Sequence, residues 1–383
     1  MTKIETLLKT LCPNGVEYKK IGDFLVLLRG KRVVRTQLSA NEKYPVYQNS
    51  LTPLGFYNLS NCVAGTPFII AAGAAGEVGC CQTDFWAADD CYYLKKDCRI
   101  NNRFLFHFLL SKRGYLLSKV RKASVPRISK NVIENIKIPV PPLAAQGEIV
   151  RILDNFTELT AELTAELTAR KKQYEFYRNT LIQKGCKYTK VKLDTICEIY
   201  DGTHQTPKYT NSGIPFVSVE NIDNLYGTKK FISPEAYVKY KIKPLMGDVF
   251  MTRITAGIIG KCAVVDRDDD LAYYVSLALL RPNATIINSK YLKYFLESSF
   301  GRKELNKWIL RDATPTKINK DDIGRIIISM PPLSEQERIV RILDRFDTLC
   351  NDISTGLPAE IAARQRQYEH YRDELLNFEK VAL

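Results

Sequence analysis

Basic side chains gather at corresponding places in two parts of this sequence, where they could neutralise phosphate groups. The first cluster contains Lys119, Arg121, Lys122 and Arg127, and the second contains Arg302, Lys303, Arg311 and Lys317. Lysine and arginine on backbone phosphates give affinity for a nucleic acid without reading its sequence. The clusters therefore predict a phosphate-binding surface in both parts, although a solvated basic helix face would give the same pattern.

Two polar loops could read bases. The loop at 29–35 (RGKRVVR) offers Lys31, Arg32 and Arg35, the loop at 201–209 (DGTHQTPKY) offers His204, Gln205 and Lys208, and Arg253 follows a later strand-like run. Arginine pairs well with guanine, and glutamine pairs well with adenine. Because the two loops differ, we expect the two parts of the chain to read different bases.

The sequence contains none of the catalytic motifs expected of a DNA-modifying enzyme. A DNA methyltransferase needs Asn or Asp before a Pro-Pro-aromatic run, but the two proline pairs here are followed by Leu143 and Leu333. The glycines before Lys261 lack P-loop spacing, and we expect the glycine run at 73–79 to form a tight turn. The three histidines are scattered, and no nucleophile and base pair stands out. We therefore expect a non-catalytic chain that binds no cofactor and no metal.

The composition agrees with a polyanionic partner. The 383 residues include 56 Lys and Arg against 42 Asp and Glu, which leaves a net charge of +14. The N-terminal residues lack the apolar core of a signal peptide, and no run reaches the about 18 apolar residues of a membrane span. Ten cysteines without zinc-ligand spacing suit a reducing compartment. We expect a protein of the cytoplasm that does not associate with membranes.

An internal duplication organises these candidates. The segment PPLAAQGEIVRILDNFTEL from Pro141 returns as PPLSEQERIVRILDRFDTL from Pro331, and QYEFYR from Gln173 returns as QYEHYR from Gln367. The match also extends upstream into the basic clusters. A repeat of this length predicts one architecture built twice, in which a globular segment is followed by a helix.

Each segment after a proline pair is predicted to form a long helix, because apolar or aromatic residues recur at alternating steps of four and three. The seam of the first helix is Ile149, Leu153, Phe156, Thr160, Leu163, Leu167, Arg170, Tyr174, Tyr177 and Leu181. The seam of the second is Ile339, Leu343, Phe346, Cys350, Ile353, Leu357, Ile361, Arg364, Tyr368, Tyr371, Leu375 and Phe378. Gly356 and Pro358 predict a local kink in the second helix.

A helix of about 40 residues is roughly 60 Å long and needs a partner. We expect the two copies to pair antiparallel as a coiled coil, because the duplication favours a pseudo-two-fold axis. The alternative is that each helix caps its own globular domain.

The globular segments mix short strand-like runs with turns and one later helix each, which indicates an α+β fold. The strand-like runs lie at 67–72, 214–219 and 248–252, and the later helices at 102–117 and 289–309. We expect four parts, namely a globular domain with a short N-terminal helix at 1–140, a central spacer helix at 141–185, a second globular domain at 186–330 and a C-terminal spacer helix at 331–383.

The chain resembles the DNA-specificity subunits of type I restriction-modification systems over essentially its whole length. The resemblance is carried by CPNGVEYKKIGD from Cys12, PPL..Q..IVRILD from Pro141 and Pro331, the QYE.YR helix ends, and GDVFMTRITAGIIGK from Gly247. It implies that each globular domain is a target-recognition domain that reads one half of a bipartite site in double-stranded DNA.

The resemblance also implies partners. The two helices would set the gap between the half-sites and dock two methyltransferase (modification) subunits, and through them restriction and translocase subunits. S-adenosylmethionine, ATP and magnesium would then bind to these partners, in the cytoplasm of a bacterium or archaeon.

The tetrapeptide TAEL occurs at Thr160 and again at Thr164. Family members that this chain resembles vary the number of such repeats. One added unit would lengthen a helix by about 6 Å and rotate it by about 400°, which is a net rotation of roughly 40°. One base pair of DNA rises about 3.4 Å and turns by about 35°. An added unit is therefore predicted to widen the unread gap by about one base pair. A plain helix former of good propensity would also produce this sequence.

A second hypothesis comes from another class of protein. The chain could be a coiled-coil scaffold whose basic domains bind RNA or other nucleic acid without sequence preference. In that case, unrelated duplexes would compete for binding as well as any selected sequence does.

Overall fold

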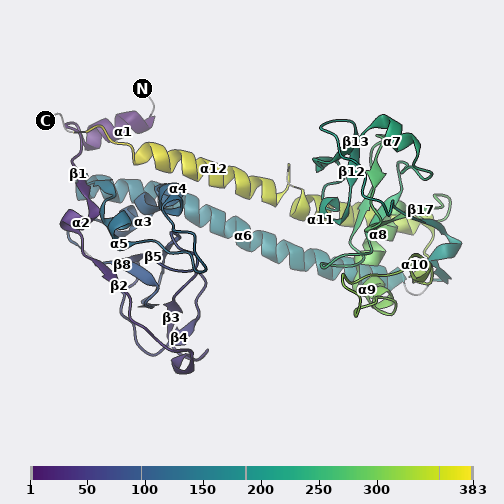
Figure 1. The fold of residues 1–383 in the computed structure, drawn as a ribbon, viewed down its shortest axis with the longest axis horizontal. Helices are drawn as coiled ribbons and strands as arrows, with labels where there is room; N and C mark the ends of the chain where they lie inside the picture. The colour runs from purple at the N-terminus through teal and green to yellow at the C-terminus, as the bar shows by residue number, and fades with distance from the viewer. Residues whose placement is uncertain (1–2, 96, 186–187, 353, 381–383) are drawn as a thin grey trace. The chain divides into compact units, whose positions relative to one another are not determined.

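The computed structural model describes residues 3–95, 97–185, 188–352 and 354–380. The chain divides into two compact units (Figure 1), of which unit 1 comprises Met1–Thr164 with Glu360–Leu383, and unit 2 comprises Ala165–Ala359. The four segments expected from the sequence describe chain order, whereas the compact units cut across both helical segments. Each unit therefore combines one globular segment with parts of both helical segments.

Unit 1 is α+β. Its helices are α1 (Lys3–Leu11), α2 (Ile21–Phe24), α3 (Asn102–Ser111), α4 (Arg113–Ser118), α5 (Lys130–Glu134), the first half of α6 (Leu143–Gly185) and most of α12 (Leu357–Leu375). Its strands are β1 (Tyr18–Lys20), β2 (Leu27–Arg29), β3 (Tyr44–Tyr47), β4 (Gly55–Tyr57), β5 (Pro67–Ile70), β6 (Val78–Cys80), β7 (Trp86–Ala87), β8 (Cys91–Leu94) and β9 (Lys137–Pro139).

Unit 2 has the same composition of elements. Its helices are the second half of α6, α7 (Pro234–Val238), α8 (Ser289–Glu297), α9 (Ser299–Asn306), α10 (Lys320–Gly324) and α11 (Leu333–Asn351). Its strands are β10 (Lys190–Lys192), β11 (Cys197–Asp201), β12 (Ile214–Val217), β13 (Phe231–Ile232), β14 (Val249–Thr252), β15 (Cys262–Val264), β16 (Ala272–Tyr273), β17 (Leu277–Pro282) and β18 (Ile327–Ser329).

The two units have the same sheet topology. A four-stranded sheet runs β2-β8-β5-β6 in unit 1 and β11-β17-β14-β15 in unit 2. A three-stranded sheet follows the order β4-β3-β7 in one and β13-β12-β16 in the other, and a two-stranded ladder pairs β1 with β9 or β10 with β18. The duplication seen in the helical motif therefore extends through both globular domains, although their sequences differ.

The glutamine of the repeated PPL..Q motif holds each long helix to its own globular domain. Gln146 is fully buried, accepts a hydrogen bond from the Asn101 backbone N–H at 2.7 Å, and donates to the carbonyl of Pro141 at 2.8 Å. Gln336 makes the same contacts with Asn288 at 2.9 Å and with Pro331 at 2.8 Å. Asn101 and Asn288 are the N-caps of α3 and α8. Each glutamine therefore links the start of its own long helix to the start of a helix in the globular domain.

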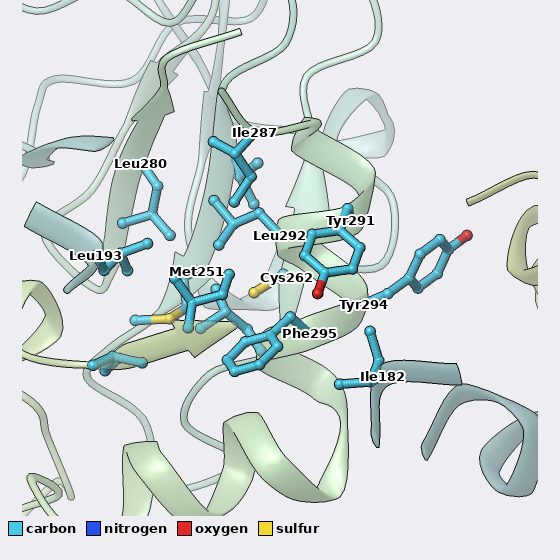
Figure 2. Packing of buried hydrophobic residues seen from close by; sticks show 14 of the residues in the cluster. Ile182, Leu193, Met251, Cys262, Leu280, Ile287, Tyr291, Leu292, Tyr294 and Phe295 are labelled. Atoms are coloured by element: carbon cyan, nitrogen blue, oxygen red, sulfur yellow. The ribbon is translucent and has the colours of Figure 1, made fainter. Parts of the chain in front are cut away.

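The main core of unit 2 lies between the four-stranded sheet and its helices (Figure 2). Met251 and Leu280 come from the sheet, Phe295 from α8 and Ile182 from α6, and all four are buried. The core of unit 1 is built in the same way, with Ile149 and Leu153 of α6 among its buried residues. Burial of such side chains contributes roughly 1.5–3 kcal/mol each.

Both units contain a helix pair. In unit 1, Phe156 of α6 stacks on Tyr371 of α12 with ring centroids 5.2 Å apart. In unit 2, Phe346 of α11 stacks on Tyr177 of α6 at 5.3 Å, and Cys350, one turn later, lies near Lys171. This order of contacts makes the unit 2 pair antiparallel. The expected α+β class with antiparallel helices is thus confirmed.

Three predicted helices prove to be interrupted. The C-terminal helical segment is not merely kinked, because α11 ends at Asn351 and α12 begins at Leu357. The helix expected at 102–117 consists of α3 and α4, and the one at 289–309 consists of α8 and α9. Ser298 causes the second break, since its hydroxyl donates to the Phe295 carbonyl at 2.6 Å and accepts from the N–H of Gly301.

No helix of the described residues is long and apolar enough to cross a membrane.

Candidate nucleic-acid interface

In unit 1, two strands of the four-stranded sheet end at the same edge. Strands β2 and β5 both pair antiparallel with β8, so they run parallel to each other and share their C-terminal edge. We call this the loop edge. Gly30 follows β2 and donates its backbone N–H to Cys91 at 2.9 Å, and Ala71 follows β5 and donates to Asp90 at 2.7 Å. The loop edge therefore joins chain segments that lie far apart in the sequence.

A basic hairpin, residues 119–127, is fixed to the loop edge of unit 1. Arg121 and Arg127 exchange backbone hydrogen bonds of 2.8 and 3.2 Å. Arg127 forms a bridge with Ala72, and the N–H of Gly73 donates to the carbonyl of Pro126 at 3.1 Å. The basic cluster predicted from the sequence is therefore held directly beside the glycine turn that follows β5.

Unit 2 repeats this arrangement. Strands β11 and β14 both pair antiparallel with β17 and end at its loop edge. The basic hairpin of unit 2, residues 310–317, closes through Leu310 and Lys317, which exchange backbone hydrogen bonds of 2.8 and 3.4 Å. A second glycine turn, residues 253–261, follows β14. Lys317 also bridges Ile254 of this turn, and Thr255 donates its N–H to the Thr316 carbonyl at 3.0 Å.

Each predicted polar loop begins at a glycine on the loop edge. A Cβ at Gly30 would lie 2.1 Å from the Ala88 carbonyl oxygen, and a Cβ at Gly202 would lie 2.4 Å from the carbonyl carbon of Tyr274. Only glycine allows this close approach of two backbones. The polar loops are thus anchored in the same way in both units, and their side chains differ beyond the anchor.

Most of the candidate DNA-binding side chains are exposed at these segments. The exposed ones are Lys31, Arg32, Arg35, Lys119, Arg121, Lys122, Arg127, His204, Gln205, Lys208 and Arg311, and Lys317 is partly buried. Lys303 is also exposed but lies in α9, outside these segments. In each unit the loop edge collects the polar loop, the glycine turn and the basic hairpin. The structure therefore brings together candidates that the sequence separates by about a hundred residues.

Two arginines among the candidates have other roles. Arg253 is 6% exposed, forms an ion pair with Asp201 and donates from Nε to the carbonyl of Ile318 at 3.3 Å. Arg302 donates to the carbonyl of Ile259 in the glycine turn. The expected DNA contact at Arg253 does not fit this structure, because its guanidinium is enclosed and joins β11, β14 and the basic hairpin.

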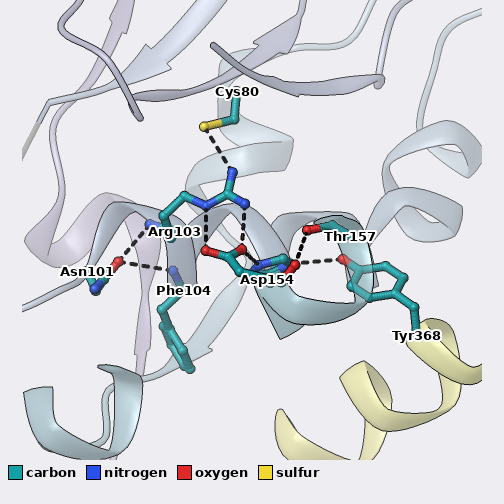
Figure 3. A network of polar contacts seen from close by, with 8 residues as sticks. Cys80, Asn101, Arg103, Phe104, Asp154, Thr157 and Tyr368 are labelled. Atoms are coloured by element: carbon teal, nitrogen blue, oxygen red, sulfur yellow. Dashed lines mark hydrogen bonds and ion pairs between the residues drawn. The ribbon is translucent and has the colours of Figure 1, made fainter. Parts of the chain in front are cut away.

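A partly buried polar network joins the globular part of unit 1 to its helix pair (Figure 3). Asp154, from the repeated IVRILD motif, accepts hydrogen bonds from Arg103 Nε at 3.2 Å and from His107 Nε2 at 2.8 Å. Because a carboxylate only accepts, Nε2 carries the proton, and His107 Nδ1 accepts from the Tyr368 hydroxyl at 2.9 Å. Burial lowers the pKa of His107, and the bond to Asp154 opposes that effect.

Unit 2 has a corresponding network with different residues. Asp344 accepts from the Tyr294 hydroxyl at 2.6 Å and pairs with Lys290 at 2.8 Å. Lys293 pairs with Asp347 at 2.8 Å. Asp154 and Asp344 hold the same place in the two motif copies, so each copy uses its aspartate to bind a helix of its globular domain. The repeated Pro-Pro-Leu motif was the available signal for these aspartates and for Gln146 and Gln336, but sequence reasoning assigned them no role.

Five of the residues predicted to pair the helices stack on one another across the helix pairs, namely Phe156, Tyr174, Tyr177, Phe346 and Tyr371. Ile149, Leu153, Tyr174, Ile339, Leu343 and Tyr368 are buried, Phe156, Leu163, Leu167, Phe346 and Tyr371 are partly buried, and Tyr177 is 39% exposed. The spacing of four and three thus selected side chains that are mostly removed from solvent. Among the described residues, no group of three His, Cys, Asp or Glu side chains could hold a metal ion.

Comparison with known proteins places the chain in a family. Residues 13–170 and 186–363 each match the family described as "Type I restriction modification DNA specificity domain". A putative type I restriction enzyme specificity subunit of Haemophilus influenzae is 31% identical over 97% of both chains. A type I specificity subunit of Escherichia coli is 35% identical over 64% of both.

The fold has solved relatives. The S subunit of a type I restriction-modification system from M. genitalium has a TM-score of 0.63 at 14% identity, over 94% of this chain and 96% of the other. A second chain, from a study of complex assembly in the type I system, has a TM-score of 0.56 at 18% identity and covers 95% of this chain and 98% of its own. The chain therefore belongs to the type I restriction-modification specificity subunits, the DNA-binding subunits that give such complexes their sequence specificity, and it carries two target-recognition domains.

Proposed function

We propose that each unit of this specificity subunit reads one half of a bipartite DNA site at its loop edge. The observation that carries the proposal is the recurrence of one backbone arrangement with different side chains. Both loop edges present a polar loop and a basic hairpin, but Lys31, Arg32 and Arg35 stand in one where His204, Gln205 and Lys208 stand in the other. Equivalent frameworks with different side chains suit two readers of different sequences.

The basic hairpins and the polar loops have different roles in this proposal. The basic hairpins supply exposed cations such as Arg121, Lys122 and Arg311 near a fixed backbone, which suits contacts to phosphates. The polar loops supply arginine, glutamine and histidine, which can donate to base edges in the major groove. Phosphate contacts would position the duplex, and the loops would select its sequence.

The helices set the distance between the half-sites in this proposal. The chain passes from unit 1 to unit 2 after Thr164, inside the TAEL stretch, and returns after Ala359. Within the stretch, Leu163 and Leu167 are partly buried while the Ala and Glu positions are exposed. A change in the number of TAEL units would therefore change the helix length without removing a buried side chain.

The helices also dock two methyltransferase subunits, through which restriction and translocase subunits join. In the repeated IVRILD motif, the Ile, Leu and Asp positions are used in packing, but Arg151 and Arg341 are exposed at matching places. Two copies of an exposed motif suit two copies of a partner. We assign S-adenosylmethionine, ATP and magnesium to those partners, no catalytic step to this chain, and a cytoplasmic location to the complex.

The test compares two matched sets of substitutions in the complex with its methyltransferase, read out by methylome sequencing. One set carries Lys31→Ala, Arg32→Ala and Arg35→Ala, and the other carries His204→Ala, Gln205→Ala and Lys208→Ala. Each set should relax the sequence at a different half of the methylated site, by roughly tenfold in discrimination per lost base contact.

Substitutions in a basic hairpin serve as the comparison. Arg121→Ala with Lys122→Ala should weaken binding to all duplexes alike and reduce the salt dependence, because phosphate contacts carry no sequence information. If both loop sets relax the same half-site, or if neither changes the methylated sequence, the proposal is wrong.

A further inference from the structure

The glycine turn of unit 2, residues 253–261, presents a large apolar side chain to solvent. Ile258 is 65% exposed, whereas the next residue, Ile259, is 6% exposed and packs into the core. Single exposed apolar residues are common on protein surfaces. The position of Ile258 is distinctive because it stands at the loop edge, beside the basic hairpin that carries Arg311 and Lys317.

The backbone that carries Ile258 is held in place by hydrogen bonds. The hydroxyl of Thr252 donates to the Ile258 carbonyl at 2.7 Å and accepts from the N–H of Lys261 at 3.0 Å. Within the turn, the N–H of Gly257 donates to the Thr255 hydroxyl at 2.9 Å. The side chain therefore projects from a fixed framework, and contact with a ligand would require little ordering of the turn.

The turn is joined to the basic hairpin of unit 2. Thr255 donates its N–H to the carbonyl of Thr316 at 3.0 Å, and Ile254 forms a bridge with Lys317. The exposed Arg311 belongs to the same hairpin. A duplex held by these basic residues would lie against the turn, so its bases are the surface that Ile258 would meet.

Unit 1 has a corresponding turn that is two residues shorter, because Gly76 donates its N–H to Ile70 whereas Gly260 donates to Thr252. Ala74 is exposed, Ala75 is buried and Gly76 has a φ of 86°, and in unit 2 Ile258 is exposed, Ile259 is buried and Gly260 has a φ of 80°. The last three residues of the two turns are thus alike in backbone and burial, and the outward side chain among them is larger in unit 2. A different outward side chain on an equivalent turn end suits a residue that reads bases.

An isoleucine side chain has no donor or acceptor, so it can distinguish bases only by apolar contact. The apolar group that the major groove displays is the methyl group of thymine. We infer that Ile258 is a specificity-determining residue that contacts a thymine methyl group in the half-site read by unit 2. The inference rests on the proposed role of the loop edge.

The test replaces thymine by uracil, which pairs identically but lacks the methyl group. The full complex with its methyltransferase is titrated with duplexes in which each thymine of the unit 2 half-site, on either strand, is replaced in turn. The unaltered complex should lose about fourfold in affinity at one position, the value expected for one buried methyl group. Ile258→Ala should weaken binding to the thymine duplex and bind both duplexes equally, and Ile258→Val should retain part of the difference.

Met246→Ala is the matched control. Met246 is 67% exposed but precedes β14, at the opposite edge of the sheet from the glycine turn, so this variant should keep the full thymine preference. The inference is overturned if the unaltered complex shows no thymine preference in that half-site, or if Ile258→Ala keeps it. It is also overturned if Ile258→Ala weakens binding to the thymine and uracil duplexes without changing the ratio of the two affinities. A side chain that inserts between base pairs would give that result. A complex that fails to prefer the natural half-site over a scrambled one would instead contradict the proposed function itself.

Discussion

At the residue scale, the same side-chain type has different roles in different surroundings. Arg121 lies exposed on a basic hairpin, whereas Arg253 is enclosed between two strands and the Ile318 carbonyl. Composition and spacing predicted both as DNA-binding residues. The sequence could not separate them, because the partner of Arg253 is Asp201, which lies in a different strand and carries no local signal.

Asp154 is the residue whose loss should affect unit 1 most clearly. Asp154→Asn removes the charge that pairs with Arg103 and leaves an amide that cannot accept every bond the carboxylate accepts. We expect a loss of about 2 kcal/mol in the free energy of unfolding, measured by urea denaturation of the purified chain.

The control is another acidic residue of α6. Glu148 pairs with Arg151 on the helix surface, where solvent screens the interaction. Glu148→Gln should leave the unfolding midpoint unchanged. Equal effects of the two substitutions would show that the Asp154 network contributes nothing beyond a surface ion pair.

At the element scale, the sequence predicted the long helices well because one stripe of apolar residues determines them. It predicted their ends less well. Gly356 and Pro358 signalled a kink, but Asp352 accepts hydrogen bonds from Ser354 and from the N–H and hydroxyl of Thr355, and this turn separates α11 from α12. Such side-chain caps compete with helix hydrogen bonds, and their outcome depends on the surrounding contacts.

The loop edge also depends on the glycine that begins each polar loop. In Gly202→Ala the new Cβ would collide with the backbone of Tyr274, so the loop that carries His204 and Gln205 must move. We expect recognition of one half-site to fall by roughly tenfold, while the other half-site stays as specific as before. Methylome sequencing of cells that carry the variant measures both.

Gly147→Ala provides the matched control for that change. Gly147 lies within α6, and an added Cβ meets nothing within 4 Å. This variant should keep both half-sites and raise the stability by about 0.5–1 kcal/mol, because alanine is the better helix former. Unchanged recognition in Gly202→Ala would argue against the anchoring role of the glycine.

At the scale of the whole molecule, the duplication was visible in the sequence, but its extent was not. The helical motif is recognisable in both copies, whereas the globular domains share few residues and nevertheless have the same strand order in every sheet. Sheet topology can persist under different side chains because backbone pairing sets it. The division into units that each contain parts of both helical segments came only from the contacts.

The central claim is that two separate readers are spaced by a helical ruler. Its most direct test inserts one additional TAEL unit after Leu167 and sequences the methylome of cells that carry the altered subunit with its methyltransferase. Because one unit adds about 6 Å of helix and slightly more than one turn, the two half-sites should stay the same and the gap between them should widen by about one base pair. A methylated site with an unchanged gap, or with altered half-sites, would contradict the claim.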